Sequence, residues 1–507
     1  MCGIVGYVGA QQAAPILLEG LQKLEYRGYD SAGIAVLDGS TIELAKACGE
    51  IKNLLAKTHD GSDLHGYIGL GHTRWATHGA PTEANAHPHV SNDGKFAIVQ
   101  NGIIENFMEL REMLQAKGFR FHSETDTEVI VHLLDMYYTG DGNLKDTVLK
   151  TLGRLEGSYA IGILCADCPE QMFLARNGCP LIIGVGAGEN FFASDVTALV
   201  SHTKNVVYLD DGELAEVRAD SYTVFDCTGK PIEKPVSRVA WDIEAAEKGG
   251  YEHFMLKEIM EQPRAIKSTL DPRVKDHRVV FDELKMTDAQ LMGFNKIMIT
   301  ACGSAFYAGQ AGKYALEKLT HIPVDADLAS EFRYRDPIVD EHTLMIIISQ
   351  SGETADTIAA IREAQSKGAY VLSIVNVVGS TIARISDDVI YTWAGPEIAV
   401  ATTKGYTTQV SVLYLLALYL GEKRGCLSRE EAAKLTDDLM ILPQMVQRAI
   451  DLNPQIAQLA ERYKNNPSLF FIGRNVDYAV CMEGSLKLKE ISYLHSEAYA
   501  AGELKHG

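Results

Sequence analysis

The sequence predicts a chain of mixed α/β and α+β class, whose second half forms doubly wound parallel sheets. Two observations carry this expectation. Apolar runs rich in β-branched residues are each followed by small polar residues and then by a helical pattern, which is the order of strand, turn and helix in a parallel sheet. The 507 residues also exceed what one hydrophobic core accommodates, and they indicate roughly three domains at about 150 residues each.

The first domain is expected over residues 2–220 and consists of short strands with a few helices. The expected strands cover residues 2–8, 33–37, 96–99, 160–164, 172–175, 181–185 and 191–193. Leucines recur at helical spacing between residues 17 and 24, and residues 128–138 also indicate a helix. Two prolines and the pair Gly249–Gly250 then interrupt the pattern, so residues 221–284 are expected to hold a linker and a connecting helix.

The second half of the chain repeats the order of strand, polar turn and helix. The expected strands cover residues 297–300, 344–348, 371–375 and 470–472. They form two units, one over residues 285–425 and one over residues 455–507. Sheets of this kind bind ligands beyond the carboxyl ends of their strands. The second unit has too few residues for a domain of usual size, so it is expected to be incomplete.

Composition excludes several classes of protein. The 47 basic and 67 acidic residues give a net charge of −20, which opposes non-specific binding to nucleic acid or to an anionic membrane. The longest apolar run, residues 410–420, is shorter than the roughly 20 residues that span a bilayer, and no signal peptide is visible. Nine scattered cysteines do not indicate a disulfide framework. A cytoplasmic location is expected.

Cys2 is the most informative residue of the first domain. Removal of the initiator methionine would make Cys2 the N-terminus, so that one residue carries a thiol nucleophile and, in its own α-amine, a base with a pKa near ~8. The alternative is that residue 2 is arbitrary and the thiol inert. The position needs support from other parts of the chain.

That support comes from segments that suit glutamine chemistry. A thiolate that attacks an amide needs hydrogen-bond donors aimed at the developing oxyanion. The side-chain amide of Asn101 and the backbone N–H of Gly102, directly after the strand expected to end at Gln100, suit this role. Arg74 can clamp a carboxylate through two parallel hydrogen bonds, and Asp126 can hold an ammonium group.

These segments, which include R-G-Y-D-S-A-G, G-H-T-R-W-A-T-H-G and N-A-H-P-H, resemble the class II glutamine amidotransferases. The resemblance implies an N-terminal-nucleophile fold of four αββα layers with Cys2 as the nucleophile. It also implies an oxyanion hole of Asn101 and Gly102, support of the site by Arg27, and a gate of an ammonia channel at Trp75. The residues implied to surround glutamine are Arg74, Thr77, His78, His87 and Asp126.

Other interpretations of the same residues stay open. Four histidines (His72, His78, His87 and His89) suggest a metal site, but their spacing and the lack of a carboxylate or cysteine among them argue against zinc. Arg74 alone could form a surface ion pair, and Trp75 could be a core residue. Asn-Gly also favours a hairpin turn at residues 101–102.

Three polar turns of the second half suit an anion. Residues 302–304 and 349–354 follow expected strands, and residues 401–404 precede a helix. Hydroxyl groups and unpaired backbone N–H groups at a helix N-terminus bind phosphate. Helix capping alone, however, also favours serine and threonine at these positions. The segment S-Q-S-G-E-T-A-D-T resembles the phosphate loop of sugar isomerase domains. Ala305 and residues 399–403 depart from that pattern. The sugar-phosphate residues so implied are Cys302, Gly303, Ser304, Ser349, Gln350, Ser351 and Thr354.

Near residue 507, Glu483, Lys487 and Glu490 are spaced to share one face of a helix, which by itself indicates a solvated face with an ion pair. The surrounding segment closely resembles the active-site region of the isomerising glutamine–fructose-6-phosphate aminotransferases. That resemblance implies that Glu490 moves a proton between two sugar carbons, that Lys487 engages the ketose carbonyl and that His506 helps to open the ring.

The resemblance extends over the whole chain and implies its substrates, L-glutamine and fructose 6-phosphate, and its product, glucosamine 6-phosphate. It implies a homodimer and no metal, flavin or nucleotide cofactor. Family members continue past Gly507, so an alternative to full synthase activity is that, if this chain is the entire protein, it hydrolyses glutamine but makes little or no glucosamine 6-phosphate. The alternatives are a phosphoribosylpyrophosphate amidotransferase, although no acidic pyrophosphate loop is found, and a sugar-phosphate sensor, which would not need Cys2.

Overall fold

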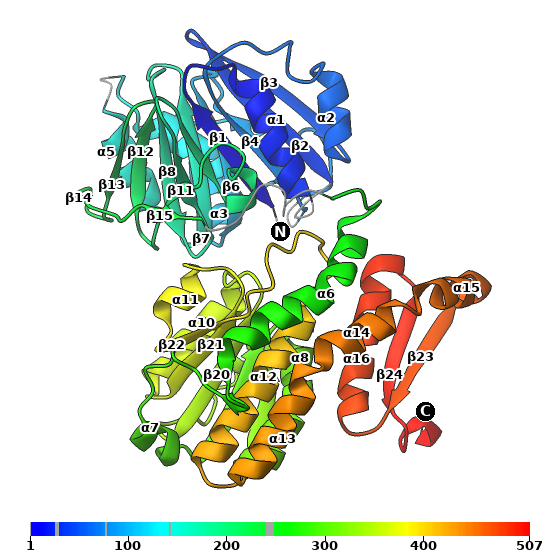
Figure 1. Ribbon diagram of the computed structural model, residues 1–507. Helices are drawn as coiled ribbons and strands as arrows, with labels where there is room; N and C mark the ends of the chain where they lie inside the picture. The colour runs from blue at the N-terminus through cyan, green and yellow to red at the C-terminus, as the bar shows by residue number, and fades with distance from the viewer. Residues whose placement is uncertain (1, 26–29, 77–78, 141–142, 240–247, 507) are drawn as a thin grey trace. The chain divides into compact units, whose positions relative to one another are not determined.

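The computed structural model describes residues 2–25, 30–76, 79–140, 143–239 and 248–506, which divide into two compact units, residues 1–243 and residues 244–507 (Figure 1). None of the helices within these residues has the length and apolar character needed to cross a membrane. Each unit has its own sheets and its own hydrophobic cores.

The N-terminal unit is built on two antiparallel sheets. The first contains, in order, β15 (Ser237–Arg238), β11 (Asn205–Tyr208), β9 (Ile182–Val185), β10 (Asn190–Ala193), β1 (Gly3–Val8), β4 (Ile68–Arg74), β2 (Ser31–Asp38) and β3 (Thr41–Cys48). The second contains β14 (Pro231–Ile232), β13 (Tyr222–Phe225), β12 (Leu214–Arg218), β8 (Gln171–Asn177), β7 (Gly157–Cys165), β6 (Phe96–Ile104) and β5 (His89–Val90).

The two sheets face each other, and helices cover their outer faces, which confirms the expected αββα layers (Figure 1). Side chains alternate between faces along each strand: on β1, Ile4 lies in the core between the sheets, whereas Val5 lies in the core under the helices. The helices on the first sheet are α1 (Ala13–Leu24), α2 (Ile51–Lys57) and the 3₁₀ turn η2 (Val196–Ala198). Those on the second sheet are α3 (Phe107–Ala116), α4 (Glu128–Tyr137) and α5 (Leu144–Leu152).

Two local expectations differ from this fold. The strand expected to end at Gln100 continues as β6 to Ile104, so the hairpin turn considered for Asn101–Gly102 is wrong. Both residues pair in regular register with β7, because Gly102 has no Cβ and can lie against the carbonyl of Ser158. Residues 222–238, expected in a linker, instead contribute the edge strands β14 and β15 and the strand β13, which pairs with β12 and β14.

The C-terminal unit is built on a parallel sheet with the order β19 (Val324–Leu328), β18 (Lys296–Ala301), β20 (Thr343–Ser349), β21 (Tyr370–Val375) and β22 (Asp388–Tyr391), which confirms the expected doubly wound class. After β18 the chain adds β19 on one side of it, and after β20 it adds β21 and β22 on the other side of the sheet. The order therefore reverses between β18 and β20, and in such sheets the ligand crevice lies at this switch point.

Helices cover both faces of the parallel sheet. One face packs against α6 (Phe254–Leu270), α7 (Asp288–Gly293), α8 (Ser304–Thr320), α12 (Lys404–Lys423) and α13 (Arg429–Met440). The other packs against α9 (Ala329–Phe332), α10 (Ala355–Ser366) and α11 (Thr381–Ile385). The remaining elements before residue 452 are η4 (Asp271–Arg273), β16 (Val274–Lys275), β17 (Arg278–Val279) and α14 (Leu442–Ile450).

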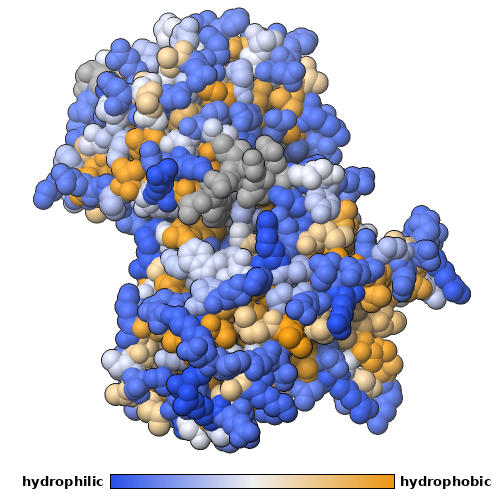
Figure 2. Space-filling view, viewed as in Figure 1, coloured by the Kyte–Doolittle hydropathy of each residue, from blue (hydrophilic) through white to orange (hydrophobic). Residues whose placement is uncertain are grey.

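A smaller set of elements follows, namely α15 (Asn453–Tyr463), β23 (Ser468–Gly473), α16 (Val476–Ser492), β24 (His495–Ala500) and η5 (Leu504–His506). The two strands are parallel and α16 connects them, as in the unit before. Apolar side chains are exposed here, among them Ile456 and Phe470, each 55% exposed. Figure 2 shows apolar side chains gathered at the surface of this part of the unit.

Candidate active site

Cys2 lies where the strands β1, β4 and β6 come together at one end of the sandwich. It directly precedes β1, and its place two residues before Ile4 puts its side chain on the face between the two sheets. The backbone of Trp75, just after β4, donates an N–H to the Cys2 Sγ at 3.3 Å. The side chain of Asn101 on β6 donates from Nδ2 to the Cys2 carbonyl at 3.2 Å. Segments about 75 and 100 residues away along the chain therefore meet at Cys2, one at its thiol and one at its backbone carbonyl.

Burial raises the pKa of the Cys2 thiol above its usual value, against the opposing effect of the Trp75 backbone N–H. Within the described ranges, the polar contacts of the Sγ are with the backbone of Trp75 and include no histidine or carboxylate. A thiol in this setting needs a proton acceptor from elsewhere.

His72 determines which way the carboxamide of Asn101 faces. The His72 Nε2 lies 3.0 Å from Asn101 Oδ1 and 3.1 Å from the Gln100 carbonyl, and both of these oxygens are acceptors. Nε2 must therefore carry the proton and donate it. The oxygen of the Asn101 amide then faces His72, and its NH₂ group faces Cys2.

His72 and His87 are neutral members of one buried cluster. Their rings stack with centroids 4.1 Å apart, and His87 Nδ1 accepts the backbone N–H of Gln100 at 3.2 Å. Burial lowers the pKa of His72 to about 3 and that of His87 well below its usual value. No group of three or more histidine, cysteine, aspartate or glutamate side chains in the described part of the chain is arranged to hold a metal ion.

Arg74 and Asp126 are both buried, with 4% of each residue exposed. Arg74 donates to the carbonyls of Gly79 and Ala80 at 3.2 Å each, so the alternative of a surface ion pair is wrong. Asp126 accepts the backbone N–H of Ile104 at 2.8 Å, at the end of β6. These two charged side chains thus connect the ends of β4 and β6 to the loops around Cys2.

The chain segment after β4 carries the remaining residues expected near glutamine. Trp75 is 46% exposed, which excludes a core role for this residue. The Asp30 carboxylate accepts the backbone N–H of Ala76 and so holds the turn that follows Trp75. Three expected site residues, Arg27, Thr77 and His78, lie outside the described residues.

The expected phosphate residues lie at the switch point of the parallel sheet. Cys302 and Gly303 follow β18 and lead into α8 at Ser304, whereas residues 350–354 follow β20 and lead into α10. Ser349 Oγ accepts the backbone N–H of Gly352 at 3.0 Å and lies 3.4 Å from the hydroxyl of Thr354. Both turns thus bring hydroxyl groups to helix N-termini at the carboxyl ends of two neighbouring strands.

The departures from the sugar isomerase pattern have structural counterparts. Ala305 is buried in the apolar core of the C-terminal unit. Two carboxylates hold the loop at residues 398–403: Glu258 accepts the backbone N–H groups of Ile398 and Ala399 at 2.6 and 3.1 Å, and Glu397 accepts that of Thr403 at 2.8 Å.

The helix α16 brings three charged side chains together. Lys487 is hydrogen-bonded to Glu490 and lies 3.5 Å from Glu483. Burial raises the pKa of Glu483 to about 7, although Lys487 and a hydrogen bond from the Ser304 side chain both favour its charged form. Ser304 is the first residue of α8, and α16 packs against this helix. His506 lies on η5, and among the described contacts none joins its side chain to Lys487 or Glu490.

The sequence prediction missed His72 and Asp30 as parts of the site. A signal for His72 was present, since Leu70, His72 and Arg74 alternate along β4 and therefore share the face between the sheets. The partner of His72 lies 29 positions away on a strand of the other sheet, and only the fold places the two together.

Two family models match the chain. A model described as "Glutamine amidotransferase domain" matches residues 50–237, and one described as "SIS domain" matches residues 290–419 and 463–507.

Curated relatives match over the full length of this chain. The chain is 54% identical to the protein of Caldanaerobacter subterraneus subsp. tengcongensis and 49% identical to that of Methanosarcina acetivorans, each named glutamine–fructose-6-phosphate aminotransferase (isomerising). Both alignments cover 100% of this chain and 83% of the relative. Among solved structures, the C-terminal domain of a glucosamine-fructose-6-phosphate aminotransferase from Francisella tularensis is 40% identical with a TM-score of 0.50, over 52% of this chain and 74% of that one.

Proposed function

Because the chain belongs to the family of isomerising glutamine–fructose-6-phosphate aminotransferases, we propose that it transfers the amide nitrogen of L-glutamine to fructose 6-phosphate and yields glucosamine 6-phosphate. The N-terminal unit hydrolyses glutamine, and the ammonia passes internally to the sugar bound in the C-terminal unit. This reaction is the first step of hexosamine biosynthesis. No cofactor is needed, since the nitrogen comes from an amide and the isomerisation is a proton transfer.

The position of Cys2 is the observation that carries the glutaminase role. Its thiol lies in the sandwich end with an amide donor on one side and a backbone N–H on the other. With the α-amine of Cys2 as the base, the thiolate attacks the glutamine amide carbon, ammonia leaves, and water hydrolyses the thioester. The Asn101 Nδ2 and the Gly102 N–H stabilise the oxyanion of both tetrahedral intermediates.

His72 acts as a positioning residue for this oxyanion hole. It is a poor acceptor of a substrate proton, since burial lowers the pKa of its ring to about 3, and its Nε2–H is donated to the Asn101 oxygen. By holding that oxygen, it keeps the amide NH₂ directed to Cys2. A reversed amide would present an oxygen to the oxyanion and repel it.

The remaining glutamine contacts are proposals that rest on the family. Arg74 binds the α-carboxylate of glutamine and Asp126 its ammonium group, because a buried guanidinium and a buried carboxylate complement these charges. Trp75, which is partly exposed beside Cys2, gates the passage of ammonia. Four further residues complete the site: Arg27, Thr77, His78 and His87.

The C-terminal unit binds the sugar phosphate in the crevice between β18 and β20. The phosphate is held by the turns at residues 302–304 and 349–354, where hydroxyl groups and helix N-termini favour an anion. On α16, Lys487 engages the ketose carbonyl and Glu490 carries the proton between C1 and C2, which requires a carboxylate close to a cation. His506 assists ring opening.

We also propose a cytoplasmic homodimer. Exposed apolar side chains on α15 and β23, among them Ile456 and Phe470, support a contact with a second copy, because contiguous apolar surface of this kind marks an interaction site (Figure 2). Light scattering on purified protein tests this, and the mass of a single chain at micromolar concentration would contradict it.

The proposed reaction is tested with three variants of the full chain. Ammonia release from glutamine and formation of glucosamine 6-phosphate from fructose 6-phosphate are measured separately. Cys2→Ala should abolish both with glutamine as the donor. Glu490→Gln should abolish only the sugar product, and His59→Ala, an exposed histidine, should change neither. Ammonia release that persists in Cys2→Ala would refute the proposal.

A further inference from the structure

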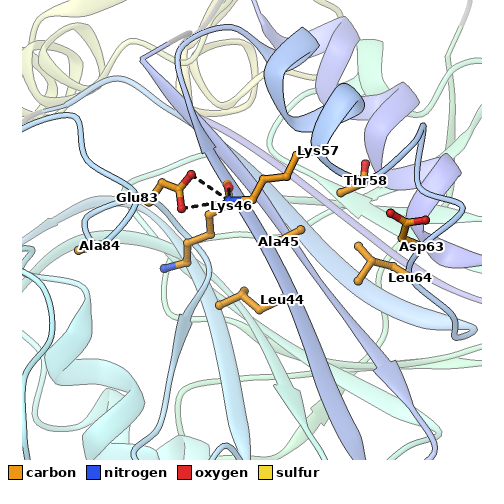
Figure 3. Close-up of a pocket in the computed structure, with 9 residues that line it drawn as sticks. All are labelled: Leu44, Ala45, Lys46, Lys57, Thr58, Asp63, Leu64, Glu83 and Ala84. Atoms are coloured by element: carbon orange, nitrogen blue, oxygen red, sulfur yellow. Dashed lines mark hydrogen bonds and ion pairs between the residues drawn. The ribbon is translucent and has the colours of Figure 1, made fainter.

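The N-terminal unit contains a pocket that none of the proposed catalytic residues lines. It has a volume of about 500 Å³, which is in the range of sites for small molecules. Three segments form it: residues 44–46 of β3, the end of α2 with the turn that follows, and residues 83–84 (Figure 3). Leu44, Leu64 and Ala84 give it an apolar wall.

Most charges in this pocket are already paired. The Lys57 ammonium donates to both carboxylate oxygens of Glu83, at 2.9 and 3.0 Å, and to the backbone carbonyl of Lys46 at 2.7 Å. Asp63 is paired with His59 at 2.6 Å. The Lys57 amine is therefore fully engaged in hydrogen bonds to Glu83 and to the Lys46 carbonyl.

The amine of Lys46 differs from that of Lys57. Among the described residues, it has no hydrogen bond or ion pair, and Figure 3 shows it pointing away from the Glu83–Lys57 pair. Burial lowers the pKa of Lys46 to about 8, although Glu128 and Glu83 favour its charged form. The side chain reaches this place across Gly33, its partner on β2, where a Cβ would lie 3.1 Å from the Lys46 Cγ.

We propose that Lys46 is a nucleophilic amine and a covalent modification site, at which small acyl phosphates acylate this chain. In this step the Nζ lone pair attacks the acyl carbon and an N–C bond forms. The C–O bond to phosphate breaks, phosphate leaves with the electron pair, and the amine proton passes to water. The proposal is independent of the glutaminase and isomerase roles, since neither uses Lys46.

The pocket favours both the reaction and its product. A lysine amine that is partly buried and unpaired has a lowered pKa, so a larger fraction of it is neutral near neutral pH than of a fully exposed lysine. Acylation removes a charge that burial disfavours and converts the side chain to a neutral amide. The pocket that Lys46 lines already contains space for a small acyl group.

The test measures initial rates of acetylation at individual lysines by peptide mass spectrometry, with acetyl phosphate and the folded full chain. Lys52 is the matched control: its side chain is 71% exposed, and the neighbouring Glu50 raises its pKa. Lys57 is the control within the pocket. At pH 7.5 we expect Lys46 to react roughly tenfold or more faster than either, with a half-maximal rate near pH 8.

A rate at Lys46 equal to or lower than that at Lys52 would overturn the proposal. Two further measurements keep the result interpretable. Chain unfolded in urea should lose the selectivity, because burial is then absent, and persistence of the preference in urea would assign it to local sequence and overturn the proposal. Lys46→Arg should lose the fast-labelling peptide while ammonia release from glutamine stays within about twofold of the unsubstituted chain, since Arg retains the charge.

Discussion

Replacing His72 by alanine tests the orientation of the oxyanion donor. The substitution removes the Nε2–H bond to Asn101 Oδ1, which is 3.0 Å long and buried. A buried hydrogen bond between neutral groups contributes about 1 kcal/mol, and complete loss of an oxyanion donor costs about 3–4 kcal/mol. The Asn101 amide remains in place but is free to reverse, so the expected loss of kcat lies between these limits, from about fivefold to roughly 900-fold.

The assay follows ammonia release from glutamine in His72→Ala, Asn101→Ala and the double variant. If His72 acts through Asn101, the His72→Ala substitution should lower kcat by only about threefold or less in the Asn101→Ala background. The KM for glutamine should change little in either background. His72→Gln, which can still donate an N–H, should recover much of the activity. Equal losses from His72→Ala in the presence and absence of Asn101 would refute this reasoning, because the effect would then be general destabilisation.

Three further predictions follow from other parts of the structure. Gly102→Ala should lower stability by about 3 kcal/mol or more, because φ is 110° and the new Cβ would lie 2.1 Å from the Ser158 carbonyl oxygen. Gly94→Ala, at φ 75° with open space around the new Cβ, should lower stability by only about 1 kcal/mol. Equal shifts of the denaturant midpoint in the two variants would contradict this. Ser349→Ala should raise KM for fructose 6-phosphate by roughly tenfold, since it removes the acceptor of the Gly352 N–H, and ammonia release measured without sugar should stay unchanged; a loss of both would assign Ser349 to folding. The pKa of Glu483 is raised to about 7, so its ionisation destabilises the C-terminal unit as pH rises from about 5 to 8. Over this interval the free energy of unfolding of Glu483→Gln should increase by roughly 2–3 kcal/mol relative to that of the unsubstituted chain. The same pH dependence of thermal unfolding in both proteins would contradict the raised pKa.

The parallel-sheet class was predictable because its signals are local, whereas the αββα layers were expected only from the resemblance to the class II glutamine amidotransferases. A run of β-branched residues with a polar turn behind it predicts a strand and a helix wherever the chain folds, as at β20 and α10. Boundaries were less predictable. The strand β6 continues through Asn101 and Gly102 since its partner β7 supplies the pairing, and nothing in the Asn-Gly dipeptide itself reports this partner.

The sequence by itself determined the chemical identity of the groups available for catalysis: a thiol at position 2, a carboxamide at 101, and hydroxyl-rich turns after two strands. The tertiary structure decided the direction in which these groups act. A carboxamide is nearly symmetric in shape, so its oxygen and nitrogen are distinguished by the ring of His72, brought from another sheet, and by the Cys2 carbonyl, which accepts from its Nδ2. The amine of Lys46 becomes distinctive only in the folded chain, where it is partly buried while Glu83 pairs with Lys57 instead. Hydrogen-bond direction and desolvation depend on distances between residues far apart along the chain, and the fold sets those distances.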